Sequence, residues 1–188
     1  MEHDLTLRHE SITLRPLQVA DAAALRALVD EEMWAGMSVP FPRSNAHMER
    51  HLAALIARPQ AYFFAVERGG ELIGRTSYYD LVEGLRVEIG NTIYGRPWWG
   101  TEVNPTTKLL LFSHAFSGFG VVRVALRCDA RNRRSHNSIR RLGARYEGTL
   151  RNFRHAADGT VADMDYFSVV DREWPAVRER LEVRLDHL

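Results

Sequence analysis

The spacing of apolar residues divides the chain into stretches with the period of a strand and stretches with the period of a helix. Strands, several of them alternating apolar and polar residues, are predicted over residues 11–17, 62–67, 71–79, 86–94, 121–128, 144–153 and 161–170. Helices, with apolar residues spaced by three and four, are predicted over residues 19–32, 47–57, 103–119, 133–142 and 171–185.

Turn and capping residues support these boundaries. Ser44 or Asn45 can cap the helix over residues 47–57, and Gly143 suits the end of a short helix. The turns RGG (68–70) and HAADGT (155–160) each join two predicted strands into a hairpin.

The order of the elements indicates the fold class. It is strand, two helices, three strands, helix, strand, helix, two strands, helix, which is typical of an α+β, mixed α/β domain. Residues 86–94 and 121–128 flank one helix, so we expect adjacent parallel strands joined by a right-handed crossover. Because the chain has no repeat and no long linker, residues 1–188 should form one domain that includes the helix at 171–185.

Composition narrows the classes of partner. The formal net charge is +1, so no overall field draws the protein to nucleic acid or membrane, and Lys108 is the only lysine. The single Cys128 excludes an internal disulfide and fits a reducing compartment. The charged N-terminus lacks the apolar core of a signal peptide, and no apolar run reaches the ~20 residues that span a bilayer. We therefore expect a soluble, cytoplasmic protein.

The stretch WWGTEVN, residues 98–104, raises a specific question. It leads into a predicted helix, whose free backbone N–H groups and dipole favour an anion such as a phosphate. Glu102 places a carboxylate in the same loop, and Pro105 cannot donate a hydrogen bond. The alternative is that the loop only starts a core helix.

Three longer segments carry a family resemblance. They are IGNTIYGRPWWGTEVN followed by TKLLLFSHAF, DARNRRSHNSIRRLGARYEGTLRN, and DYFSVVDREWP. In their order and spacing they resemble the RimJ/RimL-type branch of the GNAT N-acetyltransferases, over about residues 11–185. The resemblance implies a mixed sheet of about seven strands with helices on both faces, splayed between the fourth and fifth strands. It also implies acetyl-CoA (coenzyme A) as donor, with the pyrophosphate on the loop at 98–104, and a primary amine as acceptor.

The loop departs from the superfamily pattern of a basic residue or glutamine, two free positions, glycine, one free position, then glycine or alanine. Trp99, Glu102 and Asn104 occupy the first, fourth and last positions. A carboxylate at the fourth position repels a phosphate unless it points away, whereas asparagine tolerates the left-handed conformation. The resemblance assigns cofactor binding to Asn91, Ile93, Gly100, Thr101, Val103, Asn104, Thr106, Thr107, Asn132, Asn137 and Arg141.

The alternation within residues 86–94 predicts two faces. One carries Val87, Ile89 and Ile93, and the other carries Glu88, Gly90 and Thr92. Glu88 is the candidate general base, directly or through water, because partial burial would raise its pKa. The alternative is a structural carboxylate paired with an arginine such as Arg75. Backbone N–H groups near Asn91 to Ile93 are candidate oxyanion donors.

Ser135 is the candidate acid for the leaving thiolate. Many superfamily members place a tyrosine seven residues after the asparagine that matches Asn132, but here that residue is Ile139. The RimJ/RimL branch is similar to this chain in having a serine three residues after that asparagine. The alternative role of Ser135 is to cap the helix. Asn132 would hold the pantetheine amide or the adjoining strand, or would be only a turn residue.

The acceptor side is predicted from few residues. The candidate walls are the loop from Met33 and Trp34 to Phe41, the hairpin near Tyr78 and Tyr79, and the side chains of Trp98 and His155, although ordinary core packing would also explain most of them. The family covers protein N-terminal amines, small amines and antibiotics. An α-amine, with a pKa of about 8, needs less help from a base than lysine. No residue identifies the natural acceptor.

Two other functions and a metal site are weighed against this prediction. The basic stretch RNRRSHNSIRR (131–141) could bind RNA, but it lacks aromatic platforms. An idle acyl-CoA sensor with the same fold would fit the altered phosphate loop. His47 and His51 share a helix face without an evident third ligand, so we predict no metal site. A homodimer is plausible for this branch.

Overall fold

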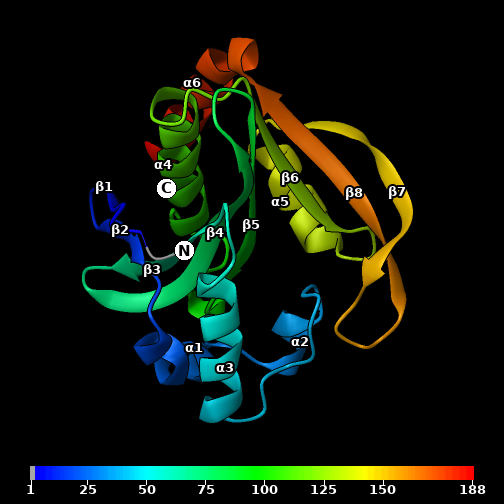
Figure 1. The fold of residues 1–188 in the computed structure, drawn as a ribbon. Coiled ribbons are helices and arrows are strands. Elements are labelled where there is room, and N and C mark those ends of the chain that lie inside the picture. Colours follow the sequence, from blue (N-terminus) through cyan, green and yellow to red (C-terminus); the bar gives the residue numbers. More distant parts are fainter. Residues whose placement is uncertain (1–2) are drawn as a thin grey trace.

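The computed structural model describes residues 3–188 and forms a single sheet with helices on both faces (Figure 1). Its strands are β1 (Leu7–His9), β2 (Ile12–Pro16), β3 (Tyr62–Arg68), β4 (Glu71–Val82), β5 (Arg86–Tyr94), β6 (Arg123–Asp129), β7 (Arg145–His155) and β8 (Val161–Val170). Its α-helices are α1 (Ala22–Leu28), α2 (Glu31–Trp34), α3 (Asn45–Ile56), α4 (Val103–Ser117), α5 (Arg133–Arg141) and α6 (Trp174–Leu185).

The eight strands lie in the order β1-β2-β3-β4-β5-β6-β8-β7. All paired neighbours among the described residues are antiparallel except β5 and β6, which are parallel and are connected through α4. This confirms the mixed fold class and the adjacent parallel pair expected from the sequence. The strand that was not predicted is β1, whose three residues are too short to show a pattern.

Two hydrophobic clusters occupy the two faces of the sheet. One packs α4, α5 and α6 against the sheet around Phe112, Ile139 and Val177. The other packs α1, α2 and α3 against the opposite face around Leu25, Trp34 and Leu52. Figure 1 shows α4 and α6 together, away from α1, α2 and α3.

The predicted helix over residues 19–32 is interrupted. Val29 is extended with φ −124°, and the Asp30 carboxylate then accepts a hydrogen bond from the Met33 N–H at 2.8 Å. Asp30 therefore caps a new helix, α2, because its short side chain competes with the helical backbone. The predicted cap of α3 is confirmed, since the Ser44 hydroxyl accepts from the His47 N–H at 3.2 Å.

The β5–β6 pairing ends early. Only four residue pairs join the strands, from Arg86 with Arg123 to Ile89 with Leu126, yet β5 continues to Tyr94. The two strands therefore part beyond Ile89, as the expected splay requires.

A β-bulge follows directly where the strands part. Ser77 of β4 pairs with Gly90 and Arg75 pairs with Ile93, so Asn91 and Thr92 together oppose Thr76. Asn91 has φ +51°, a conformation that asparagine adopts more readily than most residues.

The bulge corrects the predicted faces of this strand. One extra residue reverses the alternation, so Ile93 lies with Tyr79 and Trp34, on the face of Glu88. Thr92 turns instead to the α4 face, where its hydroxyl accepts a hydrogen bond from Lys108 at 2.8 Å. A single sequence gives no signal for such an insertion beyond asparagine itself.

No helix within residues 3–188 has both the length and the apolar character that a membrane crossing requires.

The bulge makes a stability prediction. Asn91→Gly should leave the free energy of unfolding nearly unchanged, because glycine adopts φ +51° freely. Asn91→Val should lower it by about 1–2 kcal/mol, since a β-branched residue is strained there. Urea unfolding of both variants measures the difference. Because both variants lose the asparagine side-chain amide, this loss does not contribute to the difference between them. Equal destabilisation would show that the side chain matters and the backbone conformation does not.

Candidate active site

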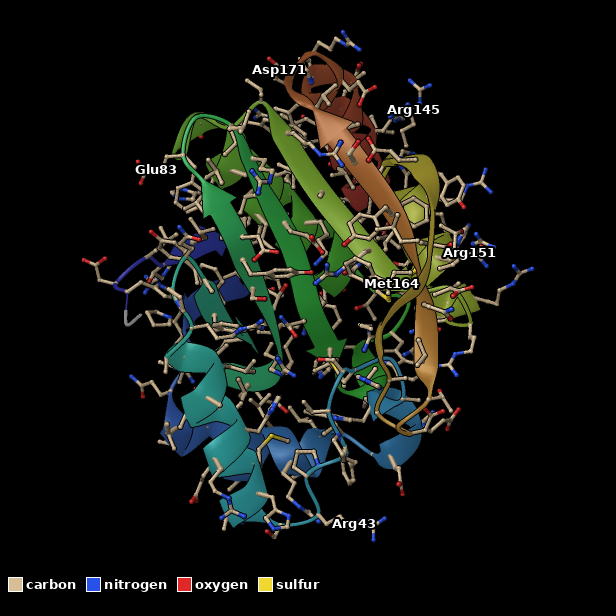
Figure 2. All side chains as sticks on the ribbon, turned by 45° about the vertical axis from the view of Figure 1, so that its right-hand side comes forward. Arg43, Glu83, Arg145, Arg151, Met164 and Asp171 are labelled. Carbon is tan, nitrogen blue, oxygen red and sulfur yellow. The ribbon has the colours of Figure 1, made fainter. Side chains whose placement is uncertain are left out.

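The candidate site lies where β5 and β6 part. Figure 2 shows the two strands side by side at one end and diverging toward the end where α2 and residues 35–44 lie. The bulge at Asn91 belongs to the unpaired part of β5, so its backbone is available on the side that faces the departing β6. Backbone N–H groups in such a position are the expected oxyanion donors, which stays a prediction.

The loop before α4 is shaped by Gly100 and Thr101. Gly100 has φ +80°, which favours glycine, and the Thr101 hydroxyl accepts a hydrogen bond from the Val103 N–H at 3.3 Å. The same hydroxyl donates to the Trp98 carbonyl at 2.9 Å, so Thr101 stabilises the loop from within. An anion would therefore be held mainly by backbone groups at the start of α4.

Glu102 does not stand unpaired at this helix terminus. Its carboxylate accepts a hydrogen bond from the Arg68 Nε at 2.8 Å, and the Arg68 guanidinium lies 5.3 Å from the centre of the Trp98 ring. Partial burial raises the pKa of Glu102, but the hydrogen bond and charge of Arg68, together with hydrogen bonds from the Glu102 backbone and Thr101, outweigh burial and lower the pKa. The carboxylate is thus charged and paired with a residue at the end of β3.

Two threonines of α4 are buried. Thr106 is 4% exposed and Thr107 is 0% exposed. Their side chains are thus covered in this structure, and their assignment to the cofactor stays a prediction. Asn104 joins α4 to α5, since its amide donates to the Ser138 hydroxyl at 3.2 Å.

Glu88 lies on the opposite face of β5 from α4 and is 7% exposed. The Tyr79 hydroxyl donates a hydrogen bond to it, and the Arg127 Nε lies 2.9 Å from the same carboxylate oxygen. Burial raises the pKa of Glu88, and the opposing effects of Arg127 and Tyr79 only reduce the rise. The alternative of a carboxylate paired with an arginine is therefore met in this structure, but by Arg127 and not by Arg75.

Asn132 caps α5, and this removes the alternative role of Ser135. The Asn132 side-chain oxygen accepts from the Ser135 N–H at 3.0 Å, so Ser135 stands inside the first turn of the helix. The Ser135 hydroxyl forms a hydrogen bond with the Cys128 sulfur. Asn137 and Arg141 are exposed on the same helix, and their assignment to the cofactor stays a prediction.

The predicted acceptor walls are partly misplaced. Tyr78 is 0% exposed and donates its hydroxyl to the Leu111 carbonyl, on the α4 face. Because side chains alternate along β4, its neighbour Tyr79 is the one beside Glu88. Trp98 packs under Arg68, next to the loop before α4. Trp34 does lie on the Glu88 face, buried, with its indole N–H bonded to the Val39 carbonyl at 2.9 Å.

Comparison with known proteins decides the family. Residues 11–145 match the family model described as acetyltransferase (GNAT) domain. The chain belongs to the GNAT acetyltransferases. No curated protein matches it.

Solved structures of GNAT proteins agree with this assignment. A protein from T. thermophilus that is described as an acetyltransferase is 32% identical, with a TM-score of 0.91 over 98% of this chain and 99% of that one. RimJ from Mycobacterium smegmatis, solved with a CoA disulfide, is 20% identical, with a TM-score of 0.78 over 96% and 93%. RimL, a ribosomal L7/L12 α-N-protein acetyltransferase solved with coenzyme A, is 17% identical, with a TM-score of 0.75 over 88% and 98%. At such low identities the last two show the fold alone.

Acetyl-CoA is the acetyl donor of this family, and the residues present fit it. The strands part at the position that the GNAT fold leaves open, and the start of α4 offers backbone donors beside Gly100. Glu102, the residue that conflicted with a diphosphate, has its charge balanced by Arg68.

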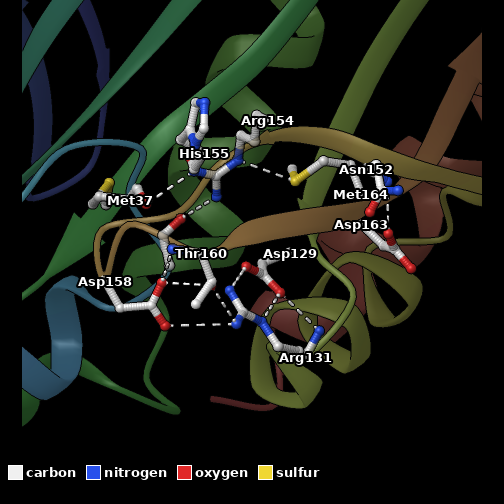
Figure 3. Close-up of polar contacts among 11 residues, drawn as sticks. Met37, Asp129, Arg131, Asn152, Arg154, His155, Asp158, Thr160, Asp163 and Met164 are labelled. Atoms are coloured by element: carbon white, nitrogen blue, oxygen red, sulfur yellow. Dashed lines mark hydrogen bonds and ion pairs between the residues drawn. The ribbon is translucent and has the colours of Figure 1, made fainter.

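One long-range contact was not predicted from the sequence. Arg154 of β7 donates hydrogen bonds at 2.9 Å to the carbonyls of both Gly36 and Met37, as Figure 3 shows for Met37. These residues are more than 100 positions apart in the chain, so no local pattern links them. The contact fixes residues 35–44 next to the β7–β8 hairpin.

A second unpredicted group lies beside Ser135. One ligand atom each of Cys128, His136 and Asp165 lies within 4.8 Å of the others, and the His136 Nδ1 is 2.8 Å from Asp165. Burial raises the pKa of the Cys128 thiol to about 11, which favours the neutral thiol. The three residues come from β6, α5 and β8, so only the fold brings them together.

Lys108 generates a prediction about pH. It is 4% exposed, its amine contacts only threonine hydroxyls, and burial lowers its pKa to about 7. In the unfolded chain its pKa is about 10, so between pH 7 and 10 the unfolded state holds more protons on this amine. The free energy of unfolding should therefore rise with pH across this window more in the wild type than in Lys108→Met. Parallel slopes in urea unfolding would contradict this.

The Arg68–Glu102 pair generates a prediction about cofactor affinity. Arg68→Met leaves an unbalanced carboxylate at the start of α4, so the Kd for acetyl-CoA should rise by roughly 2- to 5-fold. The double variant Arg68→Met/Glu102→Gln should restore the wild-type Kd in calorimetric titrations. If the double variant binds as weakly as the single one, Arg68 contacts the cofactor itself and does not act through Glu102.

Proposed function

We propose that this protein is an N-acetyltransferase of the RimJ/RimL type, which transfers the acetyl group of acetyl-CoA to a primary amine by direct attack. The observation that carries the proposal is the environment of Glu88. It is a buried carboxylate with a raised pKa, three residues before the bulge at Asn91 where β5 leaves its parallel neighbour. A raised pKa suits a general base that works near neutral pH.

Glu88 would accept the proton that the acceptor ammonium loses, directly or through water. Arg127 and Tyr79 hold its carboxylate in place, and Arg127 also balances its charge. Gly90 permits this arrangement, because a Cβ there would stand 2.7 Å from the Tyr79 hydroxyl oxygen. The base is therefore positioned by its neighbours before any substrate binds.

The other groups act on the donor side. Acetyl-CoA supplies the activated acetyl group. Backbone N–H groups from Asn91 to Ile93 would stabilise negative charge on the reacting oxygen, and the start of α4 would hold the diphosphate. Ser135, oriented by the Asn132 cap, would give its proton to the leaving sulfur.

The acceptor class remains open between a protein N-terminal α-amine and a small amine or antibiotic. An α-amine is consistent with one buried carboxylate as the base, because it loses its proton more readily than lysine. The idle sensor is less well supported, since pairing with Arg68 removes the unbalanced charge that favoured it. A cytoplasmic location and a homodimer stay predictions.

Two measurements test the proposal. Acetyl-CoA should raise the Tm with the logarithm of its concentration, and a panel of primary amines should then release free thiol. Glu88→Gln and Ser135→Ala should each lower kcat by about 10²–10⁴ and keep the Tm shift.

The outcomes separate enzyme from sensor. A Tm shift without thiol release from any amine would identify a sensor. Wild-type kcat in Glu88→Gln would show that another group takes the proton. No Tm shift at millimolar acetyl-CoA would remove the proposal altogether.

A further inference from the structure

A buried cation lies on the same face as the candidate base. Arg75 of β4 is 1% exposed and pairs in register with Ile93, just beyond the bulge. Tyr79 stands four residues further along β4, opposite Glu88, so Arg75 and the base flank the bulge from its two sides. At about 3.3 Å per residue, Arg75 and Tyr79 are roughly 13 Å apart along β4.

No carboxylate balances this guanidinium within residues 3–188. Its nearest polar neighbours are the Met37 sulfur at 3.9 Å and the His51 Nε2 at 3.4 Å, both on Nη2. Its Nη1 is buried and has no hydrogen-bond partner. The ring of Trp34, 5.4 Å away, offers a cation–π contact.

An unbalanced buried guanidinium is costly. Burial lowers the pKa of Arg75 to about 10, which still leaves it charged at neutral pH. Burial also lowers the pKa of His51 to about 4, so the imidazole beside Arg75 is neutral and cannot act as its counter-ion. By contrast, Arg127 on the same face of the sheet has a carboxylate partner in Glu88. A buried charge without a counter-ion destabilises the folded protein.

One of the side chains that contact Arg75 belongs to a loop residue, Met37. Met37 is half-buried, and methionine side chains rearrange easily. The backbone at Met37 stays fixed, because Arg154 holds its carbonyl and that of Gly36 (Figure 3). A shift of the Met37 thioether would free the Nη2 atom that it contacts, while the carbonyls of Gly36 and Met37 stay bonded to Arg154.

We propose that Arg75 binds a carboxylate of the acceptor, so that the preferred substrate is an amine that carries a carboxylate several bonds away. A guanidinium and a carboxylate form two parallel hydrogen bonds, which would satisfy the unpartnered Nη1. The amine would then project along the strand toward the bulge and Glu88. This inference rests on the proposed function and adds the acceptor class to it.

The test compares acceptors that differ only in charge. The first pair is the peptides Ala-Glu and Ala-Gln, both with amidated C-termini, and the second is 4-aminobutanoate and 4-aminobutanamide. The wild type should show a kcat/KM about 10- to 100-fold higher for the carboxylate member of at least one pair. A preference in the peptide pair points to protein N-termini, and one in the other pair to small amino acids.

Variants then locate the preference. In Arg75→Met the ratio of kcat/KM between the two members should fall toward one, whereas Arg75→Lys should keep part of it. Arg50→Met, an exposed arginine of α3 beside His51, should keep the wild-type ratio. A ratio that survives in Arg75→Met would overturn the inference, and so would a wild type without preference.

A binding measurement keeps the inference separate from the proposed function. With Arg75 intact, 4-aminobutanoate or the Ala-Glu peptide should raise the Tm more than its neutral partner, with no acetyl-CoA present. Such a shift without any thiol release would leave Arg75 as a carboxylate site and would count against the acetyl transfer. Thiol release that is equal for all four compounds would leave the enzyme standing and reject the carboxylate site.

Discussion

The parallel pairing between β5 and β6 ends at Ile89 and Leu126, and the bulge at Asn91 follows directly. Once β5 leaves β6, its N–H and C=O groups on that side lose their ladder partners, and buried backbone groups need other partners. A bulge at this point also bends the strand and turns it away from its neighbour. The unpaired backbone near Asn91, where we propose the oxyanion donors, therefore follows from one irregularity in one strand.

The bulge also decides which side chains meet. Before it, Glu88 faces α1 and α3, and after it Ile93 does, although five residues separate them. The reversal sends Thr92 to Lys108 beneath α4, where the lone lysine of the chain is buried without an anion. Because β4 is regular opposite this point, Arg75 and Tyr79 stay on the Glu88 face. A regular β5 would separate Ile93 from Arg75.

Sequence patterns predicted most of the fold because most of it is local. The RGG turn between β3 and β4, the cap at Ser44 and the apolar spacing of α4 each need only neighbouring residues. The site depends on longer range. The choice of Tyr79 over Tyr78, and of Arg127 over Arg75 as partner of Glu88, follows from register, which the sequence does not specify. The Arg154 contact joins the two ends of the domain, and the family resemblance gave no hint of it.

Two buried charged residues on one face of the sheet differ in whether they have a counter-ion. Glu88 has Arg127 as its counter-ion, while Arg75 has none within residues 3–188, although both side chains project from the same part of the sheet. They cannot pair with each other, because Ser77 and Gly90 stand between them in the register and Tyr79 fills the intervening space beside Glu88. A molecule with an amine at one end and a carboxylate at the other matches this order of charges, the amine toward Glu88 and the carboxylate toward Arg75. An amine without a carboxylate would reach Glu88 but leave Arg75 without a counter-ion. The two kinds of substrate therefore differ in whether they balance the charge of Arg75.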